Sequence, residues 1–532
     1  MNVVITRMDA WTAAGRGVER LLDAVCVGRP LQRELGGFPA PIAALPEEVD
    51  VTTLLREVVA GVLPTAGAGR VGLVVGTTSG AISGGFEAWM RRGAKPAEEL
   101  RWRSAPALAV AGALGLAPVT TVSVACASST LAFEIGAAWI RGGRCDRVIV
   151  AGVDKHSLYI HAGFAGLGAL GPTGSRPFSV DRDGLLLGEG AAAFLLEPAA
   201  CALSAPLAAL LGAATSQDAY HLTAPRPDGA GLARAIQRAL AIAALDSSEI
   251  DAVSAHGTGT VLNDAAEAQA LITAFGGAVP LHAIKGVVGH CLGAAGAVEA
   301  AVVIAALNGA PLPAPPVTAL LATRQPGEVR HAISVSAAFG GLNAAVVFGR
   351  VGAGHSPAAP GREAVGGVPL PEASTPRSTE LSRFRARKLP LSTVWPGAPA
   401  ALGRADRYVR AGVRLCRDVA PHLQFDDLIV LRSARDCRSA DLRYFSGVLA
   451  RGFAGSSRLH FPYTVPGAPL AEGSIAAGLR HAAWVLCDAD DAAVDPAALL
   501  RGAGYRRVVL LRVDAASDDP ARFAIASATL YE

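Results

Sequence analysis

One cysteine and two histidines in glycine-rich segments could carry acyl-transfer chemistry. Cys126 ends an apolar, β-prone run, TTVSVA, and begins a helix-like run. The unpaired N–H groups and the dipole at a helix N-terminus favour a thiolate there, and the thiolate is the form that attacks a carbonyl carbon. His256 lies in SAHGTGT and His290 in IKGVVGH. A thiol with two loop-borne histidines predicts acyl transfer through a covalent thioester.

Each of these residues also has a purely structural interpretation. A free cysteine is often a packed thiol, although the small neighbours of Cys126 leave room for a substrate and its own N–H could serve an oxyanion hole. His256 either satisfies loop backbone or is a neutral imidazole that donates to a thioester carbonyl. Thr258 and Thr260 offer hydroxyls to an extended polar arm. Phe339, in AAFGGLN, is either ordinary core or a movable aromatic wall over the nucleophile.

A lysine begins the loop that ends at His290. Lys285 lies in the apolar stretch HAIKGVV. A lone lysine is usually a solvated surface charge, but this setting indicates burial against an acid. The candidate acids are Glu299, Asp264 and Glu267. The loop has no Walker pattern, so a phosphate-binding interpretation is not supported.

The composition excludes several functional classes. The chain has 532 residues, of which 51% are hydrophobic and 17% charged, with a net charge of +3. This balance does not indicate a nucleic-acid surface. The eight cysteines form no CxxC pair, so neither a zinc site nor a disulfide framework is expected. No apolar run has transmembrane length, and the first residues read as a strand and not as a signal peptide. A reduced cytoplasm is the expected location.

The elements that must position these residues alternate between strand and helix. Such alternation up to about Arg350 is typical of an α/β sheet covered on both faces. Strands are expected at 71–75, 120–125, 146–154, 191–197, 251–257, 281–286, 333–339 and 344–349, and the clearest helices at 231–245 and 293–307. Residues 351–380 are rich in Gly, Pro and Ser, and we predict that they form a linker.

The last part of the chain echoes the first. Arg501–Ala515 lines up with Arg141–Lys155 without a gap, and the two segments upstream also resemble earlier ones. A gap of about three residues is needed between these matches, which places the counterpart of Cys126 between Leu486 and Ala489. We infer a partial internal duplication. The second copy ends before anything like HGTGT or KGVVGH.

Taken together, these motifs resemble the β-ketoacyl synthases of the thiolase superfamily. The resemblance rests on ACASS, HGTGT with the following ND..E, KGVVGH, FGGLNAA and the linking segment Arg176–Glu197, in the family's order. It implies a five-layered αβαβα fold of two similar halves, residues 1–200 with the cysteine and 201–350 with both histidines. It also implies a homodimer, or a heterodimer with a second ketosynthase-like subunit, packed through the first half.

The resemblance also implies a role for each site residue. Cys126 would take the acyl group from an acyl carrier protein or coenzyme A thioester. His256 and His290 would then support decarboxylation of a malonyl thioester, in a site ordered by Lys285. The remaining roles are support of the site by Glu299, Asp264 and Glu267, contact with the phosphopantetheine arm by Thr258 and Thr260, and gating of the acyl pocket by Phe339 and Phe164. No metal and no permanently bound cofactor are expected.

Two other functions remain open. The chain could be a non-catalytic partner of the chain-length-factor type, which shapes a companion's pocket. It could also be a thiolase, although SAAFGGLNAA lacks the second cysteine that thiolases need. Leu342, where the family usually has Thr, and VLND in place of PLGD leave the substrate open, and the duplicated tail favours secondary metabolism. Residues 381–532 resemble a degenerate first half, predicted to form a three-layered, non-catalytic domain that packs on a ketosynthase surface.

Overall fold

The protein is described by a computed structural model. It describes residues 1–92, 102–352, 377–385, 407–433, 444–448, 461–487, 502–514 and 525–532, together with 451, 457 and 500, and without the single positions 35, 37, 39, 65, 66, 68, 317, 319, 425, 445 and 465. No helix among these residues is long and apolar enough to cross a membrane. Most of the predicted linker, residues 353–376, lies outside the described residues.

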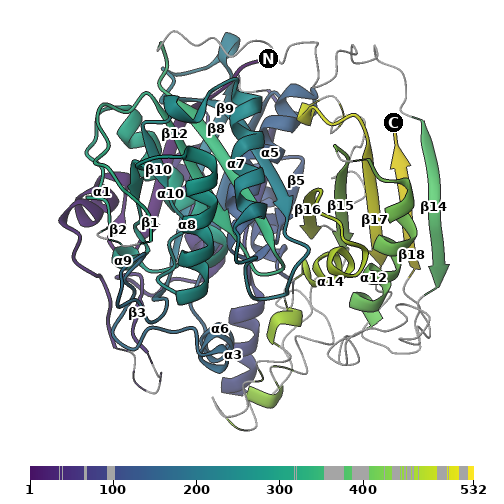
Figure 1. Cartoon of the computed structure of the whole chain (residues 1–532), viewed down its shortest axis with the longest axis horizontal. Coiled ribbons are helices and arrows are strands. Elements are labelled where there is room, and N and C mark those ends of the chain that lie inside the picture. The colour runs from purple at the N-terminus through teal and green to yellow at the C-terminus, as the bar shows by residue number, and fades with distance from the viewer. Residues whose placement is uncertain are drawn as a thin grey trace.

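One 16-stranded sheet runs through the whole described structure (Figure 1). Its order is β11 (Leu281–His282), β10 (Ala252–Ser254), β12 (His331–Ala337), β13 (Leu342–Gly349), β9 (Ala208–Gln217), β1 (Val3–Thr12), β8 (Gly190–Pro198), β6 (Arg147–Asp154), β4 (Val71–Gly76), β5 (Val119–Val122), β16 (Ala482–Cys487), β15 (Leu428–Ser433), β17 (Val508–Asp514), β18 (Ile525–Tyr531) and β14 (Ser378–Arg385). Strand β2 (Gly15–Arg16) pairs with β1, and β3 (Ile42–Ala43) pairs with β7 (Leu187–Gly188) separately.

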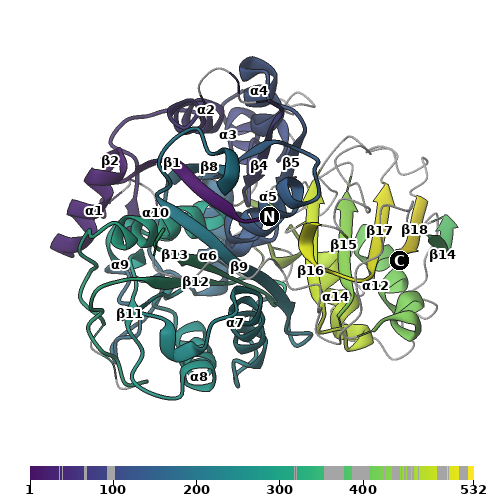
Figure 2. The same cartoon turned by 90° about the horizontal axis from the view of Figure 1, so that it is seen from above.

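The first 350 residues form the predicted five layers. Helices α5 (Ser128–Arg141) and α10 (Ala295–Leu307) lie between the two groups of strands and contact both. Helices α2 (Val51–Gly61) and α4 (Ala105–Leu114) cover one outer face, and α7 (Ala230–Ala243) and α8 (Val261–Phe275) cover the other (Figure 2). The smaller helices are α1 (Val18–Val27), α3 (Ile82–Arg92), α6 (Leu158–Leu167) and α9 (Lys285–Val288).

The composition of the two central helices explains their position. Every residue of α10, from Ala295 to Leu307, is buried, and so is every residue of α5 from Ser128 to Ile140. A helix with apolar residues on all sides is stable only where neighbours cover it completely. The many alanines also let the two groups of strands approach the helices closely. These two segments therefore form the central layer, and Cys126 and His290 lie in the turns just before them.

The C-terminal part repeats the topology of the first half. Its strand order β16-β15-β17-β18-β14 matches β5-β4-β6-β8-β1, with two parallel pairs followed by two antiparallel pairs in each. Helices α12 (Arg407–Val419) and α14 (Ala468–Ala477) pack together on this sheet. The predicted duplication is therefore visible in three dimensions. Strand β14 begins at Ser378, two residues before the predicted end of the linker.

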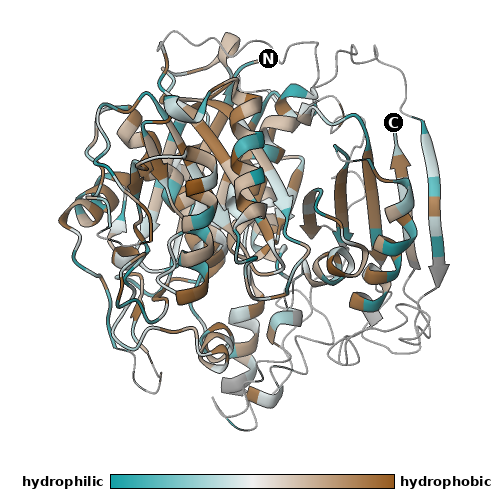
Figure 3. Cartoon of the chain, in the orientation of Figure 1, coloured by the Kyte–Doolittle hydropathy of each residue, from teal (hydrophilic) through white to brown (hydrophobic). Residues whose placement is uncertain are grey.

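The two copies join edge to edge. Val122 of β5 faces Leu486 of β16 in an antiparallel bridge, and the Ser123 N–H donates to the Val485 carbonyl at 3.2 Å. An uncovered β5 would be an open strand edge. The surface through which the resemblance places a second subunit is thus occupied by the same chain. At the far edge, β14 is hydrophilic while β15, β17 and β18 are hydrophobic (Figure 3).

Candidate active site

Cys126 lies in a tight turn between β5 and α5. The turn is a 3-10 helix, Ala125–Ala127, and Ala125 has a left-handed φ of 52°. The Ser128 hydroxyl accepts from the Val124 N–H at 3.0 Å and donates to the Ala125 carbonyl at 2.6 Å, which holds the turn closed. The strand ends before the predicted residue 125 because the turn occupies those positions. Helix α5 begins at Ser128, two residues after the cysteine.

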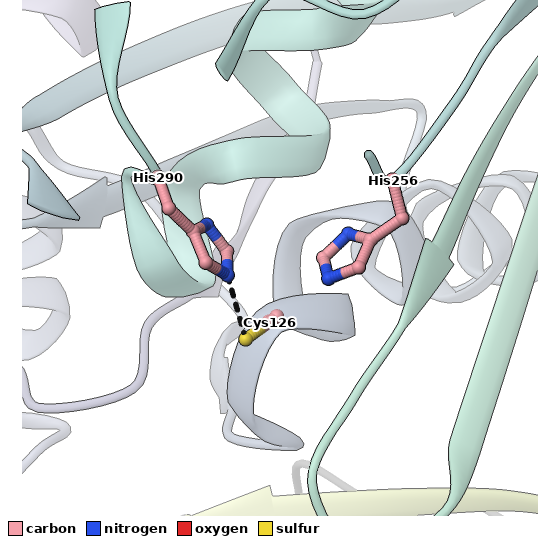
Figure 4. Close-up of side chains that lie close together, drawn as sticks. All are labelled: Cys126, His256 and His290. Carbon is pink, nitrogen blue, oxygen red and sulfur yellow. Dashed lines mark hydrogen bonds between the residues drawn. The ribbon is translucent and has the colours of Figure 1, made fainter. Parts of the chain in front are cut away.

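Two histidines from the second half converge on this thiol (Figure 4). The Nε2 atom of His290 lies 3.0 Å from Cys126 Sγ. The rings of His256 and His290 are 5.2 Å apart and nearly perpendicular, with an interplanar angle of 84°. His256 follows β10, and His290 lies beyond β11 and α9. Because β10 and β11 are paired strands, the two loops leave neighbouring strands of the sheet. The structure thus brings together the three residues singled out in the sequence.

Burial reverses one expectation for the cysteine. It raises the pKa of Cys126 to about 12, and the nearby Lys285 ammonium opposes this only in part. The same burial, with Lys285 as second cause, lowers the pKa of His256 and His290 well below the usual 6.5. The resting site therefore holds a neutral thiol between neutral imidazoles. The helix N-terminus does not produce a standing thiolate, so the thiol proton must leave during attack.

Lys285 fixes the tautomer of His256. Its Nζ contacts Glu299 Oε1, the His256 carbonyl at 2.5 Å and His256 Nδ1 at 3.3 Å. An ammonium group can only donate, so Nδ1 is an acceptor and the proton of His256 is on Nε2. That N–H points toward the thiol (Figure 4). Burial raises the pKa of Glu299 to about 7, against the opposing effect of Lys285. Of the candidate acids, Glu299 is the one that contacts the lysine.

The other two candidate acids hold the loop that carries His256. Glu267 accepts from the His256 N–H at 2.6 Å and the Gly257 N–H at 2.8 Å. Asp264 accepts from the N–H groups of Thr258 at 3.1 Å, Gly259 at 3.1 Å and Phe178 at 2.6 Å. Burial raises the pKa of both carboxyl groups, that of Glu267 to about 8. Because these acids bind backbone, they act on the shape of the loop, a role that the sequence did not reveal.

The two threonines of this loop lie side by side. Their hydroxyl oxygens are 2.9 Å apart, and that of Thr258 is also 3.4 Å from Asp264 Oδ1. Thr258 is buried and Thr260 half-buried. The Thr258 carbonyl accepts from the Ser175 hydroxyl at 2.8 Å. With the Phe178 N–H that donates to Asp264, this contact packs the start of the segment Arg176–Glu197 on the loop.

The cluster of Cys126, His256 and His290 does not suit a metal ion. Their ligand atoms lie within 4.8 Å of one another, a spacing that zinc could use. A metal-bound histidine normally donates its other ring N–H to an acceptor. Nδ1 of His256 instead faces the Lys285 ammonium. The donor set therefore fits proton transfer and hydrogen bonding.

Sequence reasoning missed a buried carboxylate behind the nucleophile. Asp154, at the end of β6, accepts from the N–H groups of Thr78 at 2.7 Å, Ser79 at 3.0 Å and Gly293 at 2.8 Å. It also accepts from the hydroxyls of Thr77 and Ser79. The signal was an acid that ends the apolar run VIVAGV of this strand. This carboxylate ties the first half to the loop before α10.

The thiol faces a cavity with mostly apolar walls. Phe164 and Phe339, the two predicted gate residues, line it together, with ring centroids 5.6 Å apart. Its other lining residues from the first 350 positions are Thr78, Arg103, Ala125, Tyr159, Ile160 and Leu292. An acyl chain on Cys126 would find apolar surface here.

The C-terminal copy forms part of the wall of this cavity. Phe461 and Thr464 line it, and the Phe461 ring lies 5.5 Å from that of Phe164. A Cβ atom at Gly163 would lie 2.2 Å from the Phe461 ring, so helix α6 admits this ring only because residue 163 is glycine. The Thr464 carbonyl accepts from Arg103 Nη2 at 2.8 Å. The sequence identified this segment as part of the second copy but gave no sign that it reaches Cys126.

Two family models and several curated proteins match this chain. The "Beta-ketoacyl synthase, N-terminal domain" family matches residues 57–202, and the "Beta-ketoacyl synthase, C-terminal domain" family matches 207–316. The chain is 37% identical over 269 residues to "3-oxoacyl-[acyl-carrier-protein] synthase 2" of Mycobacterium tuberculosis, a match that covers 45% of this chain and 64% of that protein. It is 32% identical over 312 residues to "3-oxoacyl-[acyl-carrier-protein] synthase I, chloroplastic" of Hordeum vulgare, covering 53% and 67%.

Two solved structures are similar to this chain, and one of them extends the shared fold to the C-terminal copy. A "Ketosynthase (ApeO) in Complex with its Chain Length Factor (ApeC) from Xenorhabdus doucetiae" matches 66% of this chain and 98% of that one, with 29% identity and a TM-score of 0.59. The "PfaC Keto synthase-Chain length factor" structure matches 100% of this chain and 78% of that one, with a TM-score of 0.74. Its 13% identity shows a shared fold alone. The chain belongs to the beta-ketoacyl synthase family.

Proposed function

We propose that this protein is a condensing enzyme that joins an acyl group on Cys126 to a malonyl thioester, giving a 3-oxoacyl-carrier product. The observation that carries the proposal is the His290 Nε2–Cys126 Sγ contact of 3.0 Å beside an apolar cavity. In the first step the thiol proton passes to His290 as Sγ bonds to the acyl carbon. The carrier's C–S bond breaks, and its thiolate takes the proton.

The second step forms the carbon–carbon bond. The malonyl C–CO₂ bond breaks, carbon dioxide leaves, and the enolate oxygen accepts from the Nε2–H of His256. The enolate carbon then attacks the acyl carbon on Cys126. The Cys126 C–S bond breaks, and the released thiolate takes up a proton from solvent through His290. Lys285, balanced by Glu299, keeps the His256 proton on the nitrogen that faces the substrate.

The remaining site residues act on access and on the shape of the site. Asp264 and Glu267 hold the loop of Thr258 and Thr260, whose hydroxyls would contact the phosphopantetheine arm of a carrier protein. Phe164 and Phe339 would gate the cavity. The enzyme would act on acyl carrier proteins supplied in trans in the cytoplasm, with no permanently bound cofactor.

The domain division follows from the same proposal. Residues 1–200 supply the nucleophile and residues 201–350 both histidines. Residues 381–532 take the place of a partner subunit and form part of the wall of the acyl cavity through Phe461. Because Phe461 lines the cavity, we infer that the C-terminal copy shapes the acyl pocket. One chain would then combine the condensing function with that of a chain-length factor. It also favours a polyketide-like or secondary pathway over ordinary elongation.

The test is acylation of Cys126. Wild-type protein, Cys126→Ala and the control Cys291→Ala are incubated with acyl-carrier thioesters, and intact mass and condensation are measured. Cys291 is buried next to His290 but lies outside the cavity lining. We expect an acyl adduct and condensation in the wild type and the control, and neither in Cys126→Ala, which still decarboxylates malonyl-carrier. Condensation by Cys126→Ala would refute the role, and no adduct with any donor would favour the non-catalytic partner.

A further inference from the structure

A row of polar side chains crosses three adjacent strands behind the site. Ser254 of β10 faces His282 of β11 on one side and Ser334 of β12 on the other, in parallel register. All three residues are fully buried. Neither Ser Oγ atom, nor Nδ1 or Nε2 of His282, has a hydrogen-bond partner among the described residues. Buried polar groups without partners are rare in folded proteins.

The row points into an apolar layer. Side chains alternate between the faces of a strand. Ala252 and Ala332, which share the face of the row, belong to the core packed on α10, whereas Val253 and Ile333 belong to the core of the outer helices. Apart from Glu299, α10 carries only apolar side chains and glycine. Burial alone lowers the pKa of His282 to about 4, so this ring is neutral, with one donor and one acceptor nitrogen.

We propose that an internal water molecule binds between Ser254, His282 and Ser334. Leaving such groups unpaired costs about 1–3 kcal/mol each. Neighbouring strands lie about 4.8 Å apart, a distance that one water spans between side chains on the same face. A buried water typically makes about three hydrogen bonds. Two serine hydroxyls and a neutral imidazole supply donors and acceptors for that number.

The position of this water gives it a role in the proposed condensation. The β10–β11 ladder has two register pairs and lies at the edge of the sheet. His256 follows Ser254 by two residues, and Lys285 follows His282 by three. A water bridge at the end of so short a ladder fixes the spacing of the two strands. It thereby supports the 3.3 Å contact between Lys285 Nζ and His256 Nδ1. Ser254 and His282 are thus positioning residues, a role that rests on the proposed function.

A high-resolution crystal structure of the full chain tests the water itself. We expect density within about 3.2 Å of at least two of the three side chains. Absence of density, or direct bonds among the side chains, would overturn the proposal. This result does not depend on activity, so it stands or falls apart from the acylation of Cys126.

Variants test the positioning role. His282→Leu removes both ring nitrogens, and we expect loss of the water density and a roughly tenfold lower kcat, with an unchanged KM for the acyl donor. His282→Asn, which can still bind the water, should restore most of the rate. Ser334→Ala changes the strand that carries neither His256 nor Lys285, so we expect a smaller loss. Unchanged kcat in a folded His282→Leu, or an equal loss in His282→Asn, would refute the positioning role.

Discussion

Phe461 tests whether the C-terminal copy limits the acyl chain. Its side chain is 4% exposed, and its ring centroid lies 5.5 Å from Phe164 and 5.3 Å from Tyr444. Phe461→Ala should open room for roughly three more methylene groups, each contributing about 0.8 kcal/mol when buried. The gain is about 2.4 kcal/mol, or roughly 60-fold in kcat/KM for the longer donor. Donors that end before Phe461 gain nothing.

The assay measures acylation of Cys126 with saturated acyl-carrier donors of increasing length. Because Phe→Ala in a core costs about 3–5 kcal/mol of stability, a control must separate pocket length from destabilisation. Leu470→Ala suits this purpose, since Leu470 is buried in α14 and lies outside the cavity lining. Leu470→Ala should lower stability without a change in the preferred length. An unshifted length profile in folded Phe461→Ala would refute the reasoning.

Three further predictions concern charge and assembly. Glu299→Gln leaves the Lys285 ammonium buried without its counter-ion. We therefore expect urea unfolding to show a loss of about 3–5 kcal/mol of stability, together with a slower condensation. The double variant Lys285→Met, Glu299→Leu should recover the stability but not the condensation rate, and recovery of both would contradict the proposed role of Lys285. Burial raises the pKa of Glu134 from 4.5 to about 7, where Tyr505 of the C-terminal copy donates to it at 2.8 Å. Protonation of Glu134 therefore stabilises the folded state. This contribution to the free energy of unfolding is complete below pH 4.5 and is lost as the pH rises to about 7. Glu134→Gln should flatten this part of the pH–stability profile, and an unchanged profile would be contrary evidence. Truncation after Arg350 should expose the β5 edge and cause aggregation and loss of condensation; a soluble, fully active fragment would remove the structural role of the C-terminal copy.

The sequence by itself determined the chemistry and the layers of this protein. The order of ACASS, HGTGT, KGVVGH and FGGLN identified the three residues that the structure brings together around one thiol. The stretch 293–307 was predicted as a helix, and its apolar side chains on all faces explain why the structure places it in a covered layer. The repeat of Arg141–Lys155 at Arg501–Ala515 predicted a second copy, and its strand order reproduces the first.

Only the tertiary structure decided what depends on distant segments. Whether Cys126 rests as a thiol depends on its burial by both halves, which no local motif records. Asp264 and Glu267 could have paired with Lys285 by sequence distance, yet folding directs them to backbone N–H groups of their own loop. Phe461 lines the cavity in a fold whose C-terminal copy pairs with the first half through β16 and β5. Local periodicity encodes which face of an element is apolar, but contacts between segments remote in sequence are set by how complete layers pack.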